Sequence, residues 1–302
     1  MAGANSTLDP AILDRLSGLS LVARTVVEGF TGGHHVSPHR GSSIEFAQHR
    51  PYSSGDELRK IDWKVFARSD RLVVKEYIEE TNLSCNILLD ASESMGYTSL
   101  PWTKLDYARW CAAALSHLIL IQRDTAGLVI FDEKDRVKVP PGNGAPQEAA
   151  IIGALEEAEA KGPTNIGKCL EWIASRLKRR GIIAIFSDFF DEPEAILAGV
   201  KRLVYGGHEP ILFHVLDPQE IRFEFDALVK LQGLEGVGDV KIDPKSIRDA
   251  YLEEIGRHNR LLARQARALS VDYVLLDTSR SLDAVLSAYL ARRTARARGG
   301  RR

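Results

Sequence analysis

Asp90, Ser92 and Ser94 stand at alternate positions in a short run of small and polar residues. The run before them, residues 86–89, is largely apolar and predicts a buried strand that ends at Asp90. One carboxylate and two hydroxyls within one turn offer the hard oxygen atoms that Mg²⁺ prefers. Because a single loop cannot complete such a site, we expect further oxygen ligands from elsewhere in the chain.

Strands and helices alternate from residue 83 onward. The predicted strands are 83–90, 126–131, 135–139, 181–187, 210–216 and 271–276, and the predicted helices are 103–123, 146–160, 165–179, 193–205, 246–268 and 281–293. This alternation predicts an α/β fold, a mostly parallel sheet with helices on both faces and right-handed crossovers. The tight turn at 132–135 predicts that strand 135–139 is an antiparallel edge strand, and a hairpin is predicted as an insertion near 218–244.

In open sheets of this kind, ligands bind at the carboxyl ends of the strands, where the strand order reverses. With the order 3-2-1-4-5-6, the strand that ends at Asp90 and the strand that ends before Asp188 are neighbours at the reversal. Thr164 lies in the loop before the helix that leads to the fourth strand, and it supplies another hydroxyl. The candidate metal ligands are therefore Asp90, Ser92, Ser94, Thr164 and Asp188. A site built of oxygen alone favours Mg²⁺, with Mn²⁺ or Ca²⁺ as alternatives.

Three enzymatic motifs fail on these residues. Residues 162–169 nearly match a phosphate-binding P-loop, but Cys169 stands where a hydroxyl is required and no buried strand precedes the segment. Asp90 lacks the second Asp two positions later that a haloacid dehalogenase-type enzyme needs, and glycines do not flank Ser92 or Ser94 as in a serine hydrolase. Since no nucleophile has a partnered base, we predict a site that binds and does not react. The alternative is a magnesium-dependent phosphohydrolase that uses Asp90 as its nucleophile.

The N-terminal part of the chain is predicted to begin with a helix. Asp9 is followed by proline, which is typical of a helix start, and apolar residues at helical spacing continue the helix to about residue 29. Residues 31–45 are rich in Gly, Ser and His. They include His34, His35 and His39, for which we prefer a flexible loop to a zinc site because no cysteine or fixed helical spacing accompanies them.

Residues 45–80 carry opposite charges around a Tyr and a Trp, which indicates a turn and a short helix joined by Arg–carboxylate pairs, followed by a strand at 72–78. These pairs either stabilise the local structure or form a recognition face beside the metal loop. The predicted domains are an N-terminal module over 1–80, a main domain over 81–293 and an Arg-rich flexible tail over 294–302.

Composition places the chain among ordinary globular proteins. It has 302 residues, 44% of them hydrophobic, and a net charge of −1, which gives no bias toward nucleic acid. The three cysteines show no paired spacing, so no disulfide is expected. The absence of an apolar run long enough to span a membrane predicts a soluble, cytoplasmic protein.

The candidate ligands resemble the metal-ion-dependent adhesion site of von Willebrand factor A-type (VWA) domains, which has the form D-x-S-x-S followed by a Thr and an Asp. More narrowly, an upstream run resembles the bacterial family named domain of unknown function fifty-eight, and the likeness extends from about residue 30 to 292. That run reads Arg50-x-Tyr52-x-x-Gly55-Asp56-x-x-Arg59-x-Ile61-Asp62-Trp63.

The resemblance implies a magnesium site in which Ser92, Ser94 and Thr164 bind the ion directly and Asp90 and Asp188 act mostly through water. One position would stay open for a Glu or Asp of a partner protein. The family resemblance also implies a non-enzymatic adaptor that works with a MoxR-type AAA+ ATPase in the maturation or remodelling of other proteins. Many relatives carry N-terminal membrane helices, and no such helix is recognised in this sequence, so no membrane span is expected.

Overall fold

The computed structural model describes residues 9–33, 45–53, 56, 61–78, 83–133, 135–177, 179–225, 229–231, 240–242 and 244–299. The chain divides into two compact units, residues 1–35 with 83–302 and residues 36–82. The larger unit contains the candidate ligands. The predicted domain limits at 80 and 293 stay a prediction.

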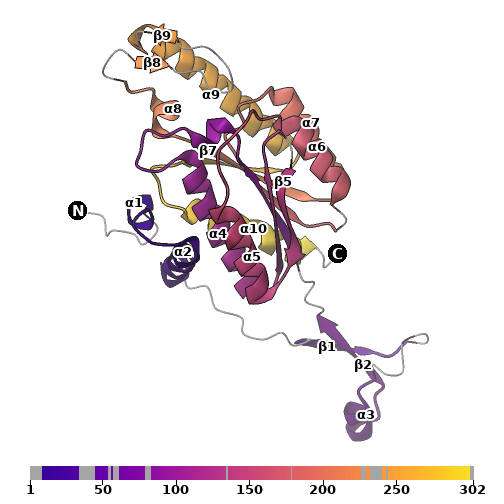
Figure 1. Ribbon diagram of the computed structural model, residues 1–302. Coiled ribbons are helices and arrows are strands. Elements are labelled where there is room, and N and C mark those ends of the chain that lie inside the picture. The colour runs from indigo at the N-terminus through magenta and orange to yellow at the C-terminus, as the bar shows by residue number, and fades with distance from the viewer. Residues whose placement is uncertain are drawn as a thin grey trace. The chain divides into compact units, whose positions relative to one another are not determined.

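The larger unit is built around a six-stranded sheet (Figure 1). Its strands are β3 (Ser84–Asp90), β4 (Thr125–Phe131), β5 (Asp135–Gly142), β6 (Ile182–Ser187), β7 (Glu209–Leu216) and β10 (Asp272–Asp277). The spatial order is β10-β7-β6-β3-β4-β5, and every neighbouring pair is parallel except β4 with β5. The predicted α/β sheet, its strand order and its antiparallel edge strand are confirmed.

Helices cover both faces of this sheet, and each face has its own apolar core. One core joins the sheet to α2 (Leu19–Gly33), α4 (Lys104–Ile121), α5 (Gly144–Glu156) and α10 (Asp283–Gly299), and the other joins it to α6 (Ile166–Arg176), α7 (Pro193–Tyr205) and α9 (Pro244–Ala268). Every residue of the central strand β3 is buried. A strand covered on both faces needs a nearly continuous apolar sequence, which is why β3 was recognisable from its sequence.

Side-chain caps fix the starts of the helices near the carboxyl ends of the strands. Thr103 caps α4 in a capping box with Asp106. Asp217, directly after β7, caps the short helix α8 (Pro218–Arg222) in a second capping box with Glu220. These caps set the positions of the first turns of α4 and α8, and both turns contribute side chains to the site described below.

The N-terminal segment forms two helices, α1 (Pro10–Leu13) and α2, where one helix had been expected. Asp9 does cap the first of them, through a hydrogen bond from the backbone N–H of Ala11 to its side chain. The predicted continuous helix is wrong because the chain turns after Leu13 and passes through Gly18 at φ +88°, a conformation that a helix interior does not allow.

The smaller unit contains an antiparallel pair, β1 (Glu45–Pro51) with β2 (Val73–Ile78), and the helix α3 (Trp63–Ser69). The predicted helix and the strand at 72–78 are confirmed, but β1 was not foreseen. Arg50 pairs with Asp56 at 2.8 Å, and His49 lies 3.0 Å from Asp62, the N-cap of α3. The Arg–carboxylate pairing expected in this segment is therefore present.

The C-terminal part adds the short antiparallel pair β8 (Val229–Leu231) and β9 (Val240–Ile242) before α9. This pair lies within the segment predicted to hold an inserted hairpin. The expected Gly-rich turn at 233–238 lies outside the described residues, as do His34, His35 and His39. Helix α10 continues to Gly299, so most of the segment expected to be a flexible tail is helical.

Candidate functional site

Asp90 and Asp188 lie at the carboxyl ends of two neighbouring parallel strands. Asp90 is the last residue of β3, and Asp188 directly follows β6. The strand order reverses between these two strands, where the chain leaves β3 toward β4 on one side and enters β6 on the other. Both carboxylates are fully buried.

The two serines join these carboxylates. Ser92 is fully buried, and its backbone N–H donates to Asp90 Oδ1 at 2.9 Å. Its Oγ lies 3.1 Å from Ser94 Oγ, at the start of the 3₁₀ helix η2 (Glu93–Gly96). The Ser94 hydroxyl is in turn hydrogen-bonded to Asp188. The structure therefore brings four of the five predicted ligands into one hydrogen-bonded chain.

Thr164 is held near this cluster by backbone hydrogen bonds between two loops. Lys161 N–H donates to the Ala91 carbonyl at 2.9 Å, and Glu93 N–H donates to the Gly162 carbonyl at 2.8 Å. The Thr164 Oγ1 atom is buried and has no hydrogen-bond partner among the described residues. A buried hydroxyl without a partner is unfavourable, so this oxygen is free for a ligand.

Sequence analysis missed Lys104, in the first turn of α4. Its side chain is 0% exposed, and its Nζ donates to Asp188 Oδ2 at 2.8 Å and to Glu220 Oε1 at 2.7 Å. Glu220 comes from the first turn of α8 and is nearly buried. No signal in the sequence marks this residue, because its turn also contains Thr103 and Asp106, and a lysine in such a turn is normally assigned to the solvent.

Ser187 was also missed, although it precedes Asp188 directly. Its hydroxyl donates to Asp90 Oδ2 at 2.6 Å and accepts from the backbone N–H of Phe189 at 2.9 Å. Both oxygens of Asp90 therefore accept hydrogen bonds. Ser187 fixes the Asp90 carboxylate from the neighbouring strand, so it orients a candidate ligand.

The protonation of the cluster follows from burial and charge. Burial, together with the nearby charge of Asp188, raises the pKa of Asp90 to about 7. Burial alone would also raise the pKa of Asp188. The charge of the Lys104 ammonium outweighs the effect of burial, so the pKa of Asp188 is lowered. The pKa of Lys104 is raised because its two carboxylate partners outweigh its own burial. Burial raises the pKa of Glu220, and Lys104 offsets this only in part.

The donor set fits a small divalent cation. Asp90, Asp188 and Glu220 carry a formal charge of minus three when ionised, and Lys104 reduces it to minus two. Hydroxyl oxygens of Ser92, Ser94 and Thr164 complete a set of hard ligands, of which only Thr164 Oγ1 lacks a hydrogen-bond partner. In the part of the chain that the structure describes, no group of three or more His, Cys, Asp or Glu side chains is arranged to hold a metal ion, so a cation here would depend on the hydroxyl oxygens.

The same contacts argue against a nucleophile. Asp90 is fully buried and each of its oxygens accepts a hydrogen bond, so its carboxylate is not exposed to a substrate. The Ser92 and Ser94 hydroxyls are hydrogen-bonded to each other, and Ser94 is also hydrogen-bonded to Asp188. None of the hydrogen bonds described for the two serines involves a histidine that could act as a base. In the P-loop-like segment, Asn165 caps α6 and the Cys169 thiol donates to the Asp132 carbonyl at 3.1 Å.

Two solved structures are similar to this chain over about two thirds of its length. An aerotolerance-related membrane protein from Bacteroides fragilis is 16% identical and covers 68% of this chain and 97% of its own, with a TM-score of 0.47. The SpRpn10 VWA domain is 11% identical and covers 68% of this chain and 94% of its own, with a TM-score of 0.40. The mostly parallel α/β sheet with helices on both faces that the sequence predicts is the fold of this chain.

The predicted cytoplasmic location is contradicted, because the similar Bacteroides fragilis structure is described as a membrane protein. The prediction rested on the lack of a long apolar run in this sequence, and that pattern does not decide location. Among the helices that the structure describes, none has both the length and the apolar character required to cross a membrane.

Two mycobacterial proteins are similar in sequence to this chain over most of its length. An uncharacterised protein of Mycobacterium tuberculosis is 26% identical over 290 residues, which cover 94% of this chain and 90% of that protein. An uncharacterised protein of Mycobacterium bovis matches to the same extent. The model of the family described as protein of unknown function DUF58 matches residues 48–261. The chain therefore belongs to the DUF58 family.

Proposed function

We propose that this protein is a non-enzymatic, Mg²⁺-dependent protein-binding module that recognises a Glu or Asp side chain of a partner. The observation that carries the proposal is the buried Thr164 Oγ1, which has no hydrogen-bond partner among the described residues. Thr164 follows residues 161–162, whose backbone is hydrogen-bonded to the loop that carries Ser92 and Ser94. Ser92, Ser94 and Thr164 would hold the ion, and Asp90 and Asp188 would support it. A bound Mg²⁺ would supply positive charge and a free coordination position for the incoming carboxylate.

The neutral hydroxyls matter for this function. Because they add no negative charge, the ion would keep part of its charge for the partner. Lys104 neutralises one carboxylate of the cluster and adds to this effect. A VWA-like fold supports a protein-interaction role. The MoxR-type AAA+ ATPase is the partner that the family resemblance suggests, and this part of the proposal rests on the resemblance alone.

Thr164→Val is the sharpest test, because valine keeps the shape of threonine and removes an oxygen that nothing in the described fold uses. Thr278→Val is the matched control. The Thr278 hydroxyl is also buried without a partner, but Thr278 follows β10, which β7 and β6 separate from β3. Capture of a MoxR-type ATPase from the same genome is measured in the presence of Mg²⁺, which the ATPase needs for its nucleotide.

The proposal expects capture by the wild type and by Thr278→Val, and its loss in Thr164→Val. Equal capture by Thr164→Val would overturn the metal-dependent mode, and no capture by the wild type would reject this partner. Incubation with p-nitrophenyl phosphate tests the phosphohydrolase alternative. The binding module gives no turnover above buffer, whereas turnover that disappears in Asp90→Asn would establish an enzyme.

A further inference from the structure

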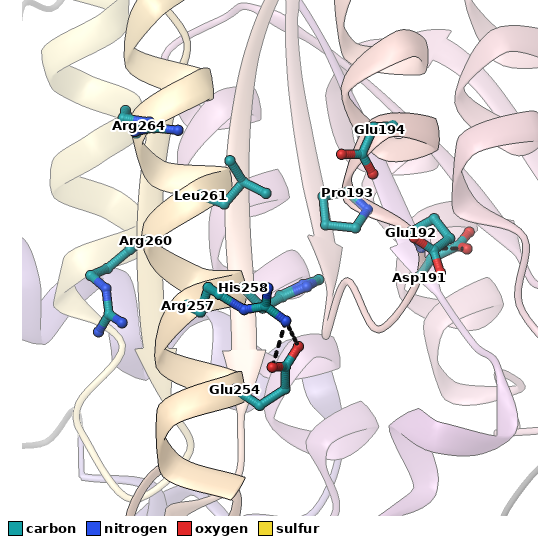
Figure 2. Close-up of a pocket in the computed structure, with 10 residues that line it drawn as sticks. All are labelled: Asp191, Glu192, Pro193, Glu194, Glu254, Arg257, His258, Arg260, Leu261 and Arg264. Carbon is teal, nitrogen blue, oxygen red and sulfur yellow. Dashed lines mark hydrogen bonds and ion pairs between the residues drawn. The ribbon is translucent and has the colours of Figure 1, made fainter. Parts of the chain in front are cut away.

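A groove runs along helix α9 next to the loop that follows β6 (Figure 2). It encloses a cavity of about 800 Å³ between residues 191–194 on one side and the stretch 254–264 of α9 on the other. His258 of α9 lies 3.0 Å from the Phe189 carbonyl and fixes the helix against this loop. None of these residues takes part in the site proposed above.

The groove continues toward the candidate metal site. A second cavity, of about 550 Å³, shares Asp191, Glu192, Glu254 and His258 with the first and adds Phe190, Tyr251 and Ile255. Phe190 is 37% exposed, which is high for a large apolar side chain. Its ring centroid lies 4.9 Å from Lys104 Nζ, and that atom donates to Asp188. The apolar end of the groove is therefore one side chain away from the cluster of carboxylates.

The two walls of the groove differ in charge, since α9 carries three arginines and one carboxylate, Glu254, and the only charged side chains of the facing wall are carboxylates (Figure 2). Arg257, Arg260 and Arg264 project from α9, and carboxylates of Asp191, Glu192 and Glu194 line the opposite wall. Arg257 is paired with Glu254 at 2.5 Å, whereas Arg260 and Arg264 form no ion pair with any described residue.

Asp191 gives a second indication that a ligand is needed. Its Oδ2 atom is buried and accepts no hydrogen bond within the described residues, while its Oδ1 accepts only from the Glu192 backbone N–H at 2.8 Å. A buried carboxylate oxygen without a donor is unfavourable. Because Asp191 lines the groove, a cationic side chain that enters the groove would pair with its carboxylate, as an acidic side chain would pair with the arginines on the facing wall.

We propose that this groove binds a segment of the partner protein with three features: an aromatic or aliphatic anchor at Phe190, acidic side chains toward Arg260 and Arg264, and a basic side chain toward Asp191. The proposal deepens the proposed function, because the anchored end of the segment lies beside the carboxylate site. The metal site alone selects only an acidic residue. The groove adds the sequence specificity that a single carboxylate cannot supply.

The test selects binders from a display library of random peptides on the full chain in Mg²⁺, and measures their affinity by fluorescence anisotropy. Selected peptides are expected to combine an apolar residue with both signs of charge. Arg260→Glu with Arg264→Glu is expected to weaken binding by about tenfold or more, because two ion pairs become repulsive. Phe190→Ala is expected to weaken it by a similar factor.

The matched control reverses two charges that line neither cavity, Lys201→Glu with Arg267→Glu, and should leave affinity unchanged. The proposal is overturned if no peptide is selected, or if the groove and control variants bind equally. It is also overturned if wild-type chains form a dimer that the groove variant abolishes, since the groove would then serve self-association.

The two proposals fail in different ways. Peptide binding that depends on Arg260 and Arg264 but persists in chelator and in Thr164→Val keeps the groove and rejects the metal-dependent function. Peptide binding that depends on Mg²⁺ but is unchanged in the Arg260→Glu, Arg264→Glu variant keeps the metal-dependent function and rejects the groove.

Discussion

Replacing Lys104 with methionine tests the electrostatics of the cluster. The substitution keeps an unbranched side chain one atom shorter than lysine, and it removes the ammonium that joins Asp188, at 2.8 Å, to Glu220, at 2.7 Å. Lys104 and Asp188 are fully buried and Glu220 is nearly so, hence two carboxylates would be left without their cation. Breaking a buried ion pair by removing one partner costs about 3–5 kcal/mol. For a unit of this size, that lowers the melting temperature by roughly 6–20 °C.

The free energy of unfolding is measured by urea titration at pH 7.5 in chelator, with tryptophan fluorescence as the signal, since Trp102 and Trp110 are buried beside the site. Lys161→Met is the control, because Lys161 forms an ion pair with Glu159 in which both side chains are about two-thirds exposed. An exposed pair contributes at most about 1 kcal/mol. Only the Lys104 variant should therefore lose several kcal/mol.

Magnesium adds a second readout. Without the ammonium, the formal charge of the cluster changes from minus two to minus three. Mg²⁺ should then stabilise Lys104→Met by more than it stabilises the wild type, and saturation at one hundred times the dissociation constant contributes about 2.7 kcal/mol. A variant as stable as the wild type in chelator, or one that gains no more from Mg²⁺, refutes this reasoning.

Two further predictions concern stability. Burial lowers the pKa of His214 to about 3, so the native state keeps this ring neutral while the unfolded state binds a proton below its ordinary pKa of 6.5. The free energy of unfolding should therefore fall as the pH drops below 6.5, and this residue accounts for about 2–3 kcal/mol of the loss at pH 4.5. In an acid titration, His214→Phe should lose stability with pH less steeply than the wild type. An equal slope in the two proteins would contradict the assignment to His214. Gly199 of α7 lies against α6, and an added Cβ would be 2.6 Å from Leu170 Cβ, so Gly199→Ala should destabilise by about 1–3 kcal/mol. Gly153→Ala in α5, where the added Cβ meets nothing within 4 Å, should leave stability unchanged or raise it. Urea titrations of both variants test whether close helix packing causes the loss in Gly199→Ala, which an equal loss in Gly153→Ala would contradict.

The sheet and the strand ends could be predicted because burial on both faces leaves a strong mark in the sequence. β3 and β6 read as continuous apolar runs that stop at a polar residue, and this places Asp90 and Asp188 without any knowledge of contacts. The topological rule then makes the two ends neighbours. Four of the five predicted ligands lie in one hydrogen-bonded chain, which follows from local spacing and strand order alone.

The rest depends on contacts between distant segments. Lys104 becomes buried only because α8 and the loop after β6 pack over the start of α4, and nothing within residues 100–108 indicates this. β1 forms because its backbone pairs with β2, more than twenty residues later in the sequence, while its own sequence resembles a charged turn. The expected single helix is divided into α1 and α2, and Gly18 adopts a positive φ directly before α2, although apolar residues continue at helical spacing.

The most direct test of the account is calorimetric titration of Mg²⁺ into the metal-free chain, with wild type, Thr164→Val and Thr278→Val compared. Thr164 Oγ1 and Thr278 Oγ1 are both buried without a hydrogen-bond partner among the described residues, so neither substitution removes a hydrogen bond of the described fold. The account predicts that the wild type and Thr278→Val bind Mg²⁺. Thr164→Val should bind it at least about tenfold more weakly, because the variant has lost one ligand. Equal binding by all three proteins, or none by the wild type, would contradict it.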